Sequence, residues 1–381
     1  MRSAYDVASL DAWTRELEDE DSKLEYLKSC PWLDKAYDRK YWRHSIHAVS
    51  SYPSKLPPQI AHHFIRLLSQ RGDVVLDPMA GSGTIPAEAC LMGRRGIGVD
   101  LSPYAHVVTS AKVHLPDPQE ALARVDWVWE RAPKSVDDDV PPEAADFFHP
   151  RTLEEILRVR AVLVGSDNPL DILLLGCLCG ILHGLRPGFL SRRSRDIIPI
   201  KPQGPFVYKE LVPRLKAKVE RVFADPVPES YVEGEAHLGD SRELSFLREK
   251  ADLVLTSPPF FATTEFVRHN WLRLWLLGWS PERQKEEALK FVGEKSLGRF
   301  EEDMERVVRE STRRLRSGGY LAIHGGRDGR RDLIDVSLRA LEKAEGMDVR
   351  TVFEENTDIA WKHALRQHSG ERHRFLIALK S

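Results

Sequence analysis

Short apolar runs alternate with longer amphipathic segments in the first and last parts of the chain. The runs at 74–77, 96–100 and 253–255 predict buried strands, because they are short, apolar and bounded by turn residues. Apolar residues in 59–68 and 85–92 instead follow the spacing of a helix. Strands that alternate with helices are typical of a doubly wound α/β sheet. We therefore predict a Rossmann-like sheet at the centre of the fold.

A long stretch without strand patterns interrupts this alternation. Helical spacing dominates 116–233, and proline-rich and acidic stretches lie near both of its ends. We expect it to be a helical insert in a main domain formed by 46–115 and 234–381. Residues 1–45 are expected to form a helical extension that packs on this domain, a lid over a ligand being the alternative. Further strands are expected at 235–238, 320–323, 349–354 and 375–379, and further helices at 265–277, 300–315 and 333–344.

Composition narrows the class of protein. The chain has 381 residues, 42% of them hydrophobic and 30% charged, and a net charge of −2. A large core is possible, and any basic surface for nucleic acid must be local. Four cysteines in a chain of this length argue against a disulfide framework. We find no signal-peptide pattern and no apolar stretch long enough to span a bilayer, so we expect a cytoplasmic protein without membrane contact.

A glycine loop follows the first predicted strand. Its sequence is Asp77-Pro78-Met79-Ala80-Gly81-Ser82-Gly83-Thr84. It lacks the third glycine of the dinucleotide fingerprint and the lysine of a phosphate loop. The second strand ends in Asp100, about 20 residues after Gly81, where an acid can hold ribose hydroxyls. The pattern indicates an adenosyl ligand without a pyrophosphate; a tight turn without a ligand is the alternative.

A rigid turn follows the strand at 253–255. It contains Thr256, Ser257, two prolines and Phe260. Two prolines can continue neither a sheet ladder nor a helix interior, so the chain turns away at the carboxyl edge of the sheet, where ligands bind. A hydroxyl, two carbonyls and an aromatic ring in fixed relation suit a planar group that carries an amine.

These two motifs together resemble those of the amino-methylating DNA methyltransferases, which modify N4 of cytosine or N6 of adenine. The resemblance covers roughly 44–114 and 235–324 and implies a Rossmann-like sheet that binds S-adenosylmethionine. It implies that the turn Ser257-Pro258-Pro259-Phe260 holds the target base. The cofactor-binding residues that it implies are Ser54, Lys55, Pro57, Asp77, Pro78, Met79, Ala80, Gly81, Ser82, Gly83, Thr84, Asp100, Leu101, Asp240 and Thr256. Met79 and Phe260 depart from the family's commonest residues, since an aromatic and a tyrosine are usual there.

The residue types predict direct methyl transfer to an exocyclic amine. The Ser257 hydroxyl and the Pro258 carbonyl can accept the two N–H groups, and Phe260 offers a stacking face for a flipped base. Within the family, serine before the two prolines favours N4 of cytosine. Adenine N6 methylation, methylation of an RNA base amine and a non-catalytic nucleic-acid-binding protein are the alternatives.

The insert contains a local excess of positive charge. Between 186 and 221 there are ten Lys or Arg and three acids. Such an excess is typical of a phosphate-binding surface. We expect the insert to be a target-recognition region for double-stranded DNA, while a solvated helix face is equally compatible with 209–221. The predicted DNA-binding residues are Arg186, Arg192, Arg193, Arg195 and Lys201.

Three further expectations concern partners and metals. A cognate restriction endonuclease is a possible partner, and the protein would associate with the nucleoid when it acts on DNA. Cys177 and Cys179 lie in an apolar run and are interpreted as packing residues. We predict no metal site, and His363, His368 and His373 are interpreted as residues near the substrate face.

Overall fold

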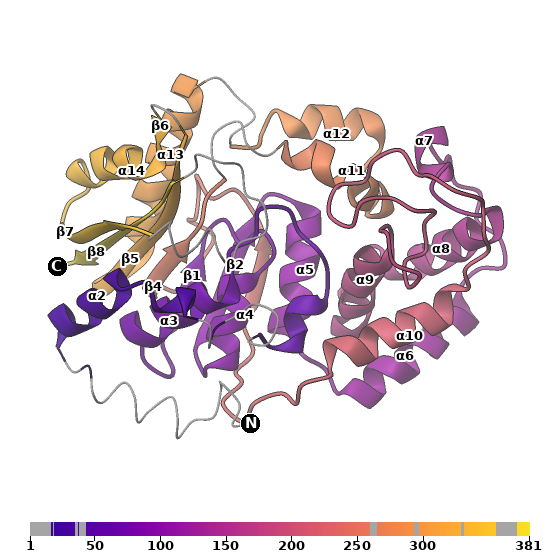
Figure 1. The fold of residues 1–381 in the computed structure, drawn as a ribbon, viewed down its shortest axis with the longest axis horizontal. Coiled ribbons are helices and arrows are strands. Elements are labelled where there is room, and N and C mark those ends of the chain that lie inside the picture. The colour runs from indigo at the N-terminus through magenta and orange to yellow at the C-terminus, as the bar shows by residue number, and fades with distance from the viewer. Residues whose placement is uncertain are drawn as a thin grey trace.

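A twisted sheet lies at the centre of the computed structural model, which describes residues 17, 19–34, 37, 43–259, 265–292, 297–328, 331–355 and 372–381 (Figure 1). Its strands follow the order β3-β2-β1-β4-β5-β8-β7, and β6 pairs with β5. Neighbouring strands from β3 to β5 are parallel, whereas β8 is antiparallel to β5 and β7. The strands are β1 (Val74–Asp77), β2 (Arg95–Asp100), β3 (Glu235–Leu238), β4 (Ala251–Thr256), β5 (Leu315–Asp328), β6 (Arg331–Asp332), β7 (Met347–Glu354) and β8 (Arg372–Lys380). The predicted Rossmann-like sheet is confirmed.

Helices cover both faces of the sheet because alternate residues of each strand point to opposite sides. Val75 and Leu253 pack on the face covered by α2 (Glu20–Lys28), α3 (Pro58–Leu68) and α4 (Thr84–Leu91). Val74 and Val254 pack on the other face, which α13 (Leu297–Arg314) and α14 (Leu333–Glu342) cover. Both layers are therefore closed around the parallel strands, as such sheets require.

Proline marks the start of many helices in this chain. Its fixed φ suits the first helical position, and a polar residue before it can cap the free N–H groups. Ser102 accepts a hydrogen bond from the backbone N–H of Ala105 at the start of α5 (Pro103–Val113). Asp117 and Asn168 do the same for α6 (Pro118–Arg131) and α9 (Pro169–Ile181).

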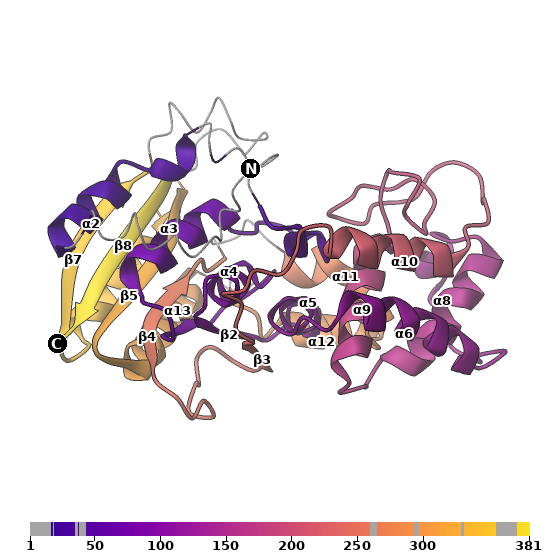
Figure 2. The same cartoon turned by 90° about the horizontal axis from the view of Figure 1, so that it is seen from below.

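The predicted insert is helical, and it lies at the end of the molecule away from β7 and β8 (Figures 1 and 2). Its remaining helices are α7 (Pro142–Ala145), α8 (Pro150–Leu163) and α10 (Leu211–Val222). Buried residues of α9 share one apolar core with α5 and with α11 (Phe266–Leu276). The insert is thus joined to the sheet domain by a continuous core. Residues 183–210, called the insert loop below, contain no helix or named strand.

A few elements differ from the predicted ones. The strand expected at 320–323 extends over the whole of β5, and α12 (Pro281–Ala288) forms where we predicted no element. Two 3-10 helices, η1 (Pro31–Leu33) and η3 (Ser45–Ala48), precede α3. Much of the predicted N-terminal extension lies outside the described residues. None of the helices that the structure describes is long and apolar enough to cross a membrane.

Candidate active site

A pocket of about 950 Å³ lies at the carboxyl edge of the parallel strands. The ends of β1 and β2 and the turn after β4 line it, together with 52–57, before α3, and 195–198 of the insert loop. This edge is where open α/β sheets bind ligands. The sequence-predicted residues that line it are Ser54, Lys55, Pro57, Asp77, Pro78, Met79, Ala80, Gly81, Ser82, Thr84, Asp100, Leu101, Arg195, Asp240, Ser257, Pro258 and Pro259. The two predicted halves of the site therefore open into one cavity.

Asp77 ends β1 and is buried at the base of the pocket. Its Oδ1 accepts hydrogen bonds from the Met79 backbone N–H (3.1 Å) and from Thr256 Oγ1 (2.8 Å). Burial raises the pKa of Asp77 to about 7, although both hydrogen bonds oppose the shift. Thr256 does not line the pocket; its hydroxyl instead links β4 to β1 beneath it.

Asp100, at the end of β2, organises the glycine loop. Its Oδ2 accepts the Gly81 N–H (2.8 Å) and its Oδ1 accepts the Ser102 N–H (2.9 Å). Burial raises the pKa of Asp100 to about 6 against these hydrogen bonds. Gly83 does not line the pocket but has φ +66°, and a Cβ there would lie 2.7 Å from Thr109 Oγ1. Its glycine is needed for close packing on α5.

Tyr52 closes one side of the pocket, and sequence reasoning did not select it. Its ring stacks on Tyr104, with centroids 5.3 Å apart, and a Cβ on Gly81 would lie 3.3 Å from Tyr52 Cε1. The Tyr52 hydroxyl is buried without a hydrogen-bond partner among the described residues. Buried polar groups normally have a partner, so a polar ligand atom would complete this site. The pocket thus fits a ligand that is both planar and polar.

Asp240, after β3, is held by Arg242. Arg242 Nη2 lies 2.6 Å from Asp240 Oδ2, and Arg242 Nη1 lies 3.0 Å from Asp303 Oδ2. Burial raises the pKa of Asp240, but the Arg242 hydrogen bonds outweigh it and hold that pKa below its ordinary value. Asp240 is therefore a fixed anion at the rim of the pocket.

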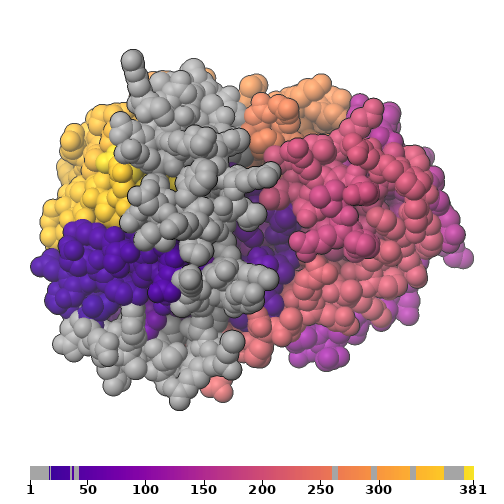
Figure 3. All heavy atoms as spheres, in the orientation of Figure 1, coloured from indigo at the N-terminus to yellow at the C-terminus, as the bar shows by residue number. Residues whose placement is uncertain are grey.

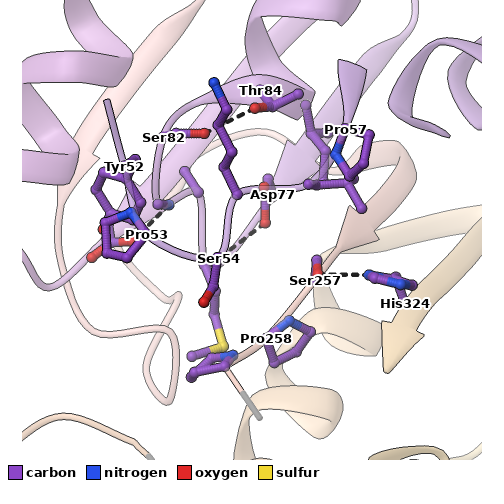
Figure 4. A pocket seen from close by; sticks show the side chains of 18 of the residues that line it. Tyr52, Pro53, Ser54, Pro57, Asp77, Ser82, Thr84, Ser257, Pro258 and His324 are labelled. Carbon is purple, nitrogen blue, oxygen red and sulfur yellow. Dashed lines mark hydrogen bonds between the residues drawn. The ribbon is translucent and has the colours of Figure 1, made fainter. Parts of the chain in front are cut away.

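The Pro-Pro turn faces a histidine that the predicted site lacked. Ser257 Oγ and His324 Nδ1 are joined by a hydrogen bond of 2.8 Å (Figure 4). Pro258 is buried and Pro259 half-buried, and both line the pocket with Ser257. Phe260 lies outside the described residues, so its predicted stacking role stays a prediction. His324 follows directly after the predicted strand 320–323, at the edge where sites form, and this position was the signal that could have identified it.

A buried arginine of α11 holds the insert loop in place beside the pocket. Arg273 is 1% exposed and donates to the carbonyl of Ile197 (2.9 Å) and to Ser51 Oγ (2.8 Å). It also donates to the Asp196 carbonyl (3.2 Å). These contacts fix the insert loop to the segment before α3, so the loop forms a wall of the cavity. The space-filling view shows the insert as one end of this face of the molecule (Figure 3).

The five predicted DNA-binding residues differ in their surroundings. Arg186, Arg193, Arg195 and Lys201 are exposed, and Arg195 lines the pocket. Arg192 is instead engaged within the insert: its Nη1 donates to Asp146 Oδ1 (2.6 Å) and its Nε to the Gly204 carbonyl (2.8 Å). Packing rather than DNA contact is therefore the better interpretation of Arg192.

The remaining candidates are the cysteines and histidines considered as metal ligands. Cys177 and Cys179 are fully buried in the core shared by α9, α5 and α11. The described residues contain no group of three or more His, Cys, Asp or Glu that could hold a metal ion. His363 and His368 lie outside the described residues, whereas His373 lines the pocket. His47 and His62 both bind the buried carboxylate of Glu88, at 2.7 Å and 3.2 Å.

The strand order and the pocket at the carboxyl edge of the parallel strands are those of a Rossmann-like fold. Residues 6–110 match the model of the N6_N4_Mtase family, described as DNA methylase. The chain is 32% identical over 75 residues to the type II methyltransferase M.MjaII of Methanocaldococcus jannaschii, a match that covers 20% of this chain and 14% of that protein. It is 30% identical over 89 residues to the type II methyltransferase M.HpaI of Haemophilus parainfluenzae. This match covers 23% of this chain and 28% of that protein. Over residues 6–110 the chain is therefore similar to the DNA methylases of this family.

These matches are partial, and the structural similarities are distant. The matched segments span less than a third of each curated relative. The rRNA methyltransferase aviRa of Streptomyces viridochromogenes has a TM-score of 0.37 at 12% identity, covering 88% of this chain and 91% of that one. TrmN of Thermus thermophilus has a TM-score of 0.33 at 14% identity, covering 86% and 49%. Similarity at this level carries no argument about the substrate.

Proposed function

We propose that the protein transfers a methyl group from S-adenosylmethionine to the exocyclic amine of a base in double-stranded DNA, with N4 of cytosine favoured over N6 of adenine. The observation that carries this proposal is the meeting of two motifs in one cavity. Asp77, Asp100 and the glycine loop line this cavity together with Ser257 and its two prolines. Figure 4 shows Asp77 and Ser257 within it. A site that must bring a cofactor and a base together needs both halves in reach of each other.

The residues around the glycine loop fit the proposed cofactor. Asp100 presents a carboxylate already oriented by two backbone N–H groups, which suits the ribose hydroxyls. The Tyr52 hydroxyl and the Asp240 carboxylate offer further polar contacts, and Met79 and Leu101 offer apolar ones. We propose that these residues, with Ser54, Lys55 and Pro57, hold the cofactor. When bound, S-adenosylmethionine supplies an electrophilic methyl group.

The turn after β4 is proposed to hold and orient the amine. A base amine is a poor nucleophile because its lone pair is delocalised into the ring. Ser257 and the carbonyl of Pro258 can accept its two N–H groups, which favours a pyramidal nitrogen with its lone pair free. Pro259 and Pro258 keep these acceptors in place because their φ angles are fixed. The contribution of the protein is thus orientation and exclusion of water.

The insert is proposed to recognise the DNA. Arg186, Arg193, Arg195 and Lys201 form an exposed basic surface, and Arg195 joins that surface to the pocket. Lys and Arg on phosphates supply affinity, while the sequence must be read from base edges. Exposed apolar side chains of the same loop, Leu185 (55% exposed) and Ile197 (46%), also line the pocket. The insert loop therefore combines charge and apolar surface beside the place where a flipped base would enter.

Cytosine is favoured by the residue before the two prolines. Ser257 presents a neutral hydroxyl, where an adenine-methylating site of this family commonly presents a carboxylate or an amide. If the Ser257 hydroxyl donates its hydrogen bond to His324 Nδ1, its lone pairs stay available to accept an amine N–H. A cognate endonuclease and association with the nucleoid remain expectations from the sequence.

The test is a methyl-transfer assay with labelled S-adenosylmethionine. Duplex DNA and total RNA are incubated in parallel, and the labelled nucleoside is then identified by mass spectrometry. We expect N4-methylcytosine from DNA with the wild-type chain and about 100- to 1,000-fold slower formation with Ser257→Ala. N6-methyladenine would overturn the base assignment alone. Label only in RNA, or no label with a chain that binds the cofactor, would overturn the proposed function.

A further inference from the structure

A row of three side chains leads from the Pro-Pro turn along the end of the sheet. Ser257 Oγ lies 2.8 Å from His324 Nδ1, and His324 Nε2 lies 2.8 Å from His373 Nδ1. The strand register explains the first contact, because Thr256, the last residue of β4, pairs with Ile323 of β5. The residues that follow this pair are Ser257 and His324. All three residues line the pocket.

His324 is held rigidly in this row. It is 5% exposed, and its ring stacks on His373 with centroids 5.0 Å apart and an interplanar angle of 23°. On another side its ring packs against that of Phe375, with centroids 4.8 Å apart. Phe375 is itself buried against Phe64 of α3. The ring of His324 is therefore fixed by aromatic packing and by a hydrogen bond at each nitrogen, the kind of support that precise sites require.

We propose that His324 orients the Ser257 hydroxyl and, with His373, forms a proton relay that removes the amine proton during methyl transfer. This inference rests on the proposed function, since it concerns the same reaction. It assigns His324 to Ser257 as a hydrogen-bond partner. It also gives the released proton a route through His324 and His373. Neither role follows from the Ser-Pro-Pro motif itself.

A neutral His324 allows two arrangements of the hydrogens in this row, and the relay requires one of them. Burial lowers the pKa of His324 well below its ordinary value, so the ring is neutral and carries a single N–H. With that hydrogen on Nε2 and donated to His373 Nδ1, His324 Nδ1 accepts the Ser257 hydroxyl. The lone pairs of Ser257 Oγ are then free to accept an amine N–H. The opposite tautomer would make Ser257 the acceptor from His324 and leave its hydroxyl proton directed elsewhere.

Methyl transfer leaves a proton that the relay must carry away. As the new bond from nitrogen to methyl carbon forms, the bond from sulfur to that carbon breaks, and the nitrogen is left with one proton too many. Ser257 Oγ accepts this proton while its own hydroxyl proton moves to His324 Nδ1. His324 passes its Nε2 proton to His373 Nδ1, and half-buried His373 releases a proton to solvent. Ser257 and His324 end neutral, with His324 in its other tautomer.

The experiment is a double-mutant cycle measured in single turnover with duplex DNA. We expect His324→Phe to lower the transfer rate by about 100-fold, the usual contribution of a positioned acid–base group. Calorimetric affinity for S-adenosylmethionine should stay within threefold of wild type. His324→Asn keeps an acceptor beside Ser257 but breaks the link to His373. Its transfer rate should therefore lie between those of the wild type and His324→Phe. Ser257→Ala with His324→Phe should be no slower than Ser257→Ala alone, because both residues act as one unit.

Three results would overturn the relay. These are a His324→Phe rate within threefold of wild type, single-variant effects that multiply in the double variant, and a His324→Asn rate equal to wild type. If His324→Phe does not fold, by its melting temperature, the same cycle is run with His324→Asn. His237→Phe, on the outer strand β3 and outside the pocket lining, is the control and should keep the wild-type rate. An inactive wild type would refute the proposed function instead, so the two failures are distinct.

Discussion

The two walls of the pocket are built by different physical means. The wall proposed for the cofactor consists of strand ends and a glycine loop, and backbone N–H groups fix its carboxylates at 2.8–3.1 Å. The wall proposed for DNA is the insert loop, which has no regular element and is anchored by the long side chain of Arg273. The first wall is rigid because the sheet determines it. The second is held by local backbone hydrogen bonds and side-chain contacts outside the sheet, so its sequence is freer to vary with the target.

This difference separates catalytic from recognition effects. Changes in the first wall and its Pro-Pro turn should act on cofactor affinity or on the chemical step. Changes in the insert loop should act on DNA affinity while the chemical step stays intact. The predictions below test this division, in order of decreasing effect.

The largest effect is expected from Ser257→Ala. The change removes an acceptor for the amine while leaving Asp77, Asp100 and the glycine loop untouched. The single-turnover rate should fall by about 100- to 1,000-fold, as for loss of one oriented hydrogen-bonding group in other sites. The affinity for S-adenosylmethionine, measured by calorimetry, should stay at the wild-type value. A wild-type rate would show that the turn does not hold the reacting base. Ser337→Ala, on α14 and outside the pocket lining, serves as the control.

The next effect concerns Asp100. Asp100→Ala removes the acceptor of the Gly81 and Ser102 N–H groups and leaves two donors unpaired. The change also removes the carboxylate proposed to accept the ribose hydroxyls, a loss of about 1.5–3 kcal/mol, so cofactor affinity should fall by at least about tenfold. Asp100→Asn keeps one acceptor and should lie between Asp100→Ala and wild type. Calorimetric titration with S-adenosylmethionine measures both variants. An affinity within threefold of wild type for Asp100→Ala would remove Asp100 from the cofactor wall.

The first wall should also respond to pH through Asp77. Its pKa is raised to about 7 in the folded chain, so between about pH 4 and pH 7 the folded state holds a proton that the unfolded state has lost. The contribution of Asp77 to the free energy of unfolding of the ligand-free chain should therefore fall as pH rises through this window, by at most about 1.4 kcal/mol per pH unit. Asp77→Asn should remove this contribution. Urea unfolding at pH 5 and pH 7 measures it, and an unchanged slope in Asp77→Asn would assign the dependence to another group.

The sequence predicted the first wall well because its signals are local. Asp77, Gly81 and Asp100 stand at strand ends and in a turn, where spacing alone determines position. Thr256 illustrates the limit of this reasoning: it was predicted to contact the cofactor, but the structure places its hydroxyl on Asp77 below the pocket. The motif identified the residue, whereas its partner depended on how β4 lies beside β1.

The second wall and the histidine row could not be predicted because they depend on distant pairings. His324 meets Ser257 only through the register of β4 and β5, and His373 arrives from the last strand. Arg273 was assigned no role, since nothing near it in sequence shows that it binds the insert loop. Charge counting found the basic segment but could not distinguish Arg192, which is engaged with Asp146, from exposed Arg195.

The difference between Arg192 and Arg195 gives the smallest expected effect. It also compares two neighbouring residues of the insert loop directly. Arg195→Ala should weaken duplex DNA binding severalfold and reduce the salt dependence by about one phosphate contact, because its charge is exposed beside the pocket. Arg192→Ala should leave DNA affinity nearly unchanged but lower the free energy of unfolding by about 1–2 kcal/mol, since it leaves Asp146 and the Gly204 carbonyl without their donor. Fluorescence anisotropy at several salt concentrations and urea unfolding measure the two quantities. If Arg192→Ala weakened DNA binding more than Arg195→Ala, the DNA-facing side of the insert loop would be the opposite one, and the division between the two walls would have to be redrawn.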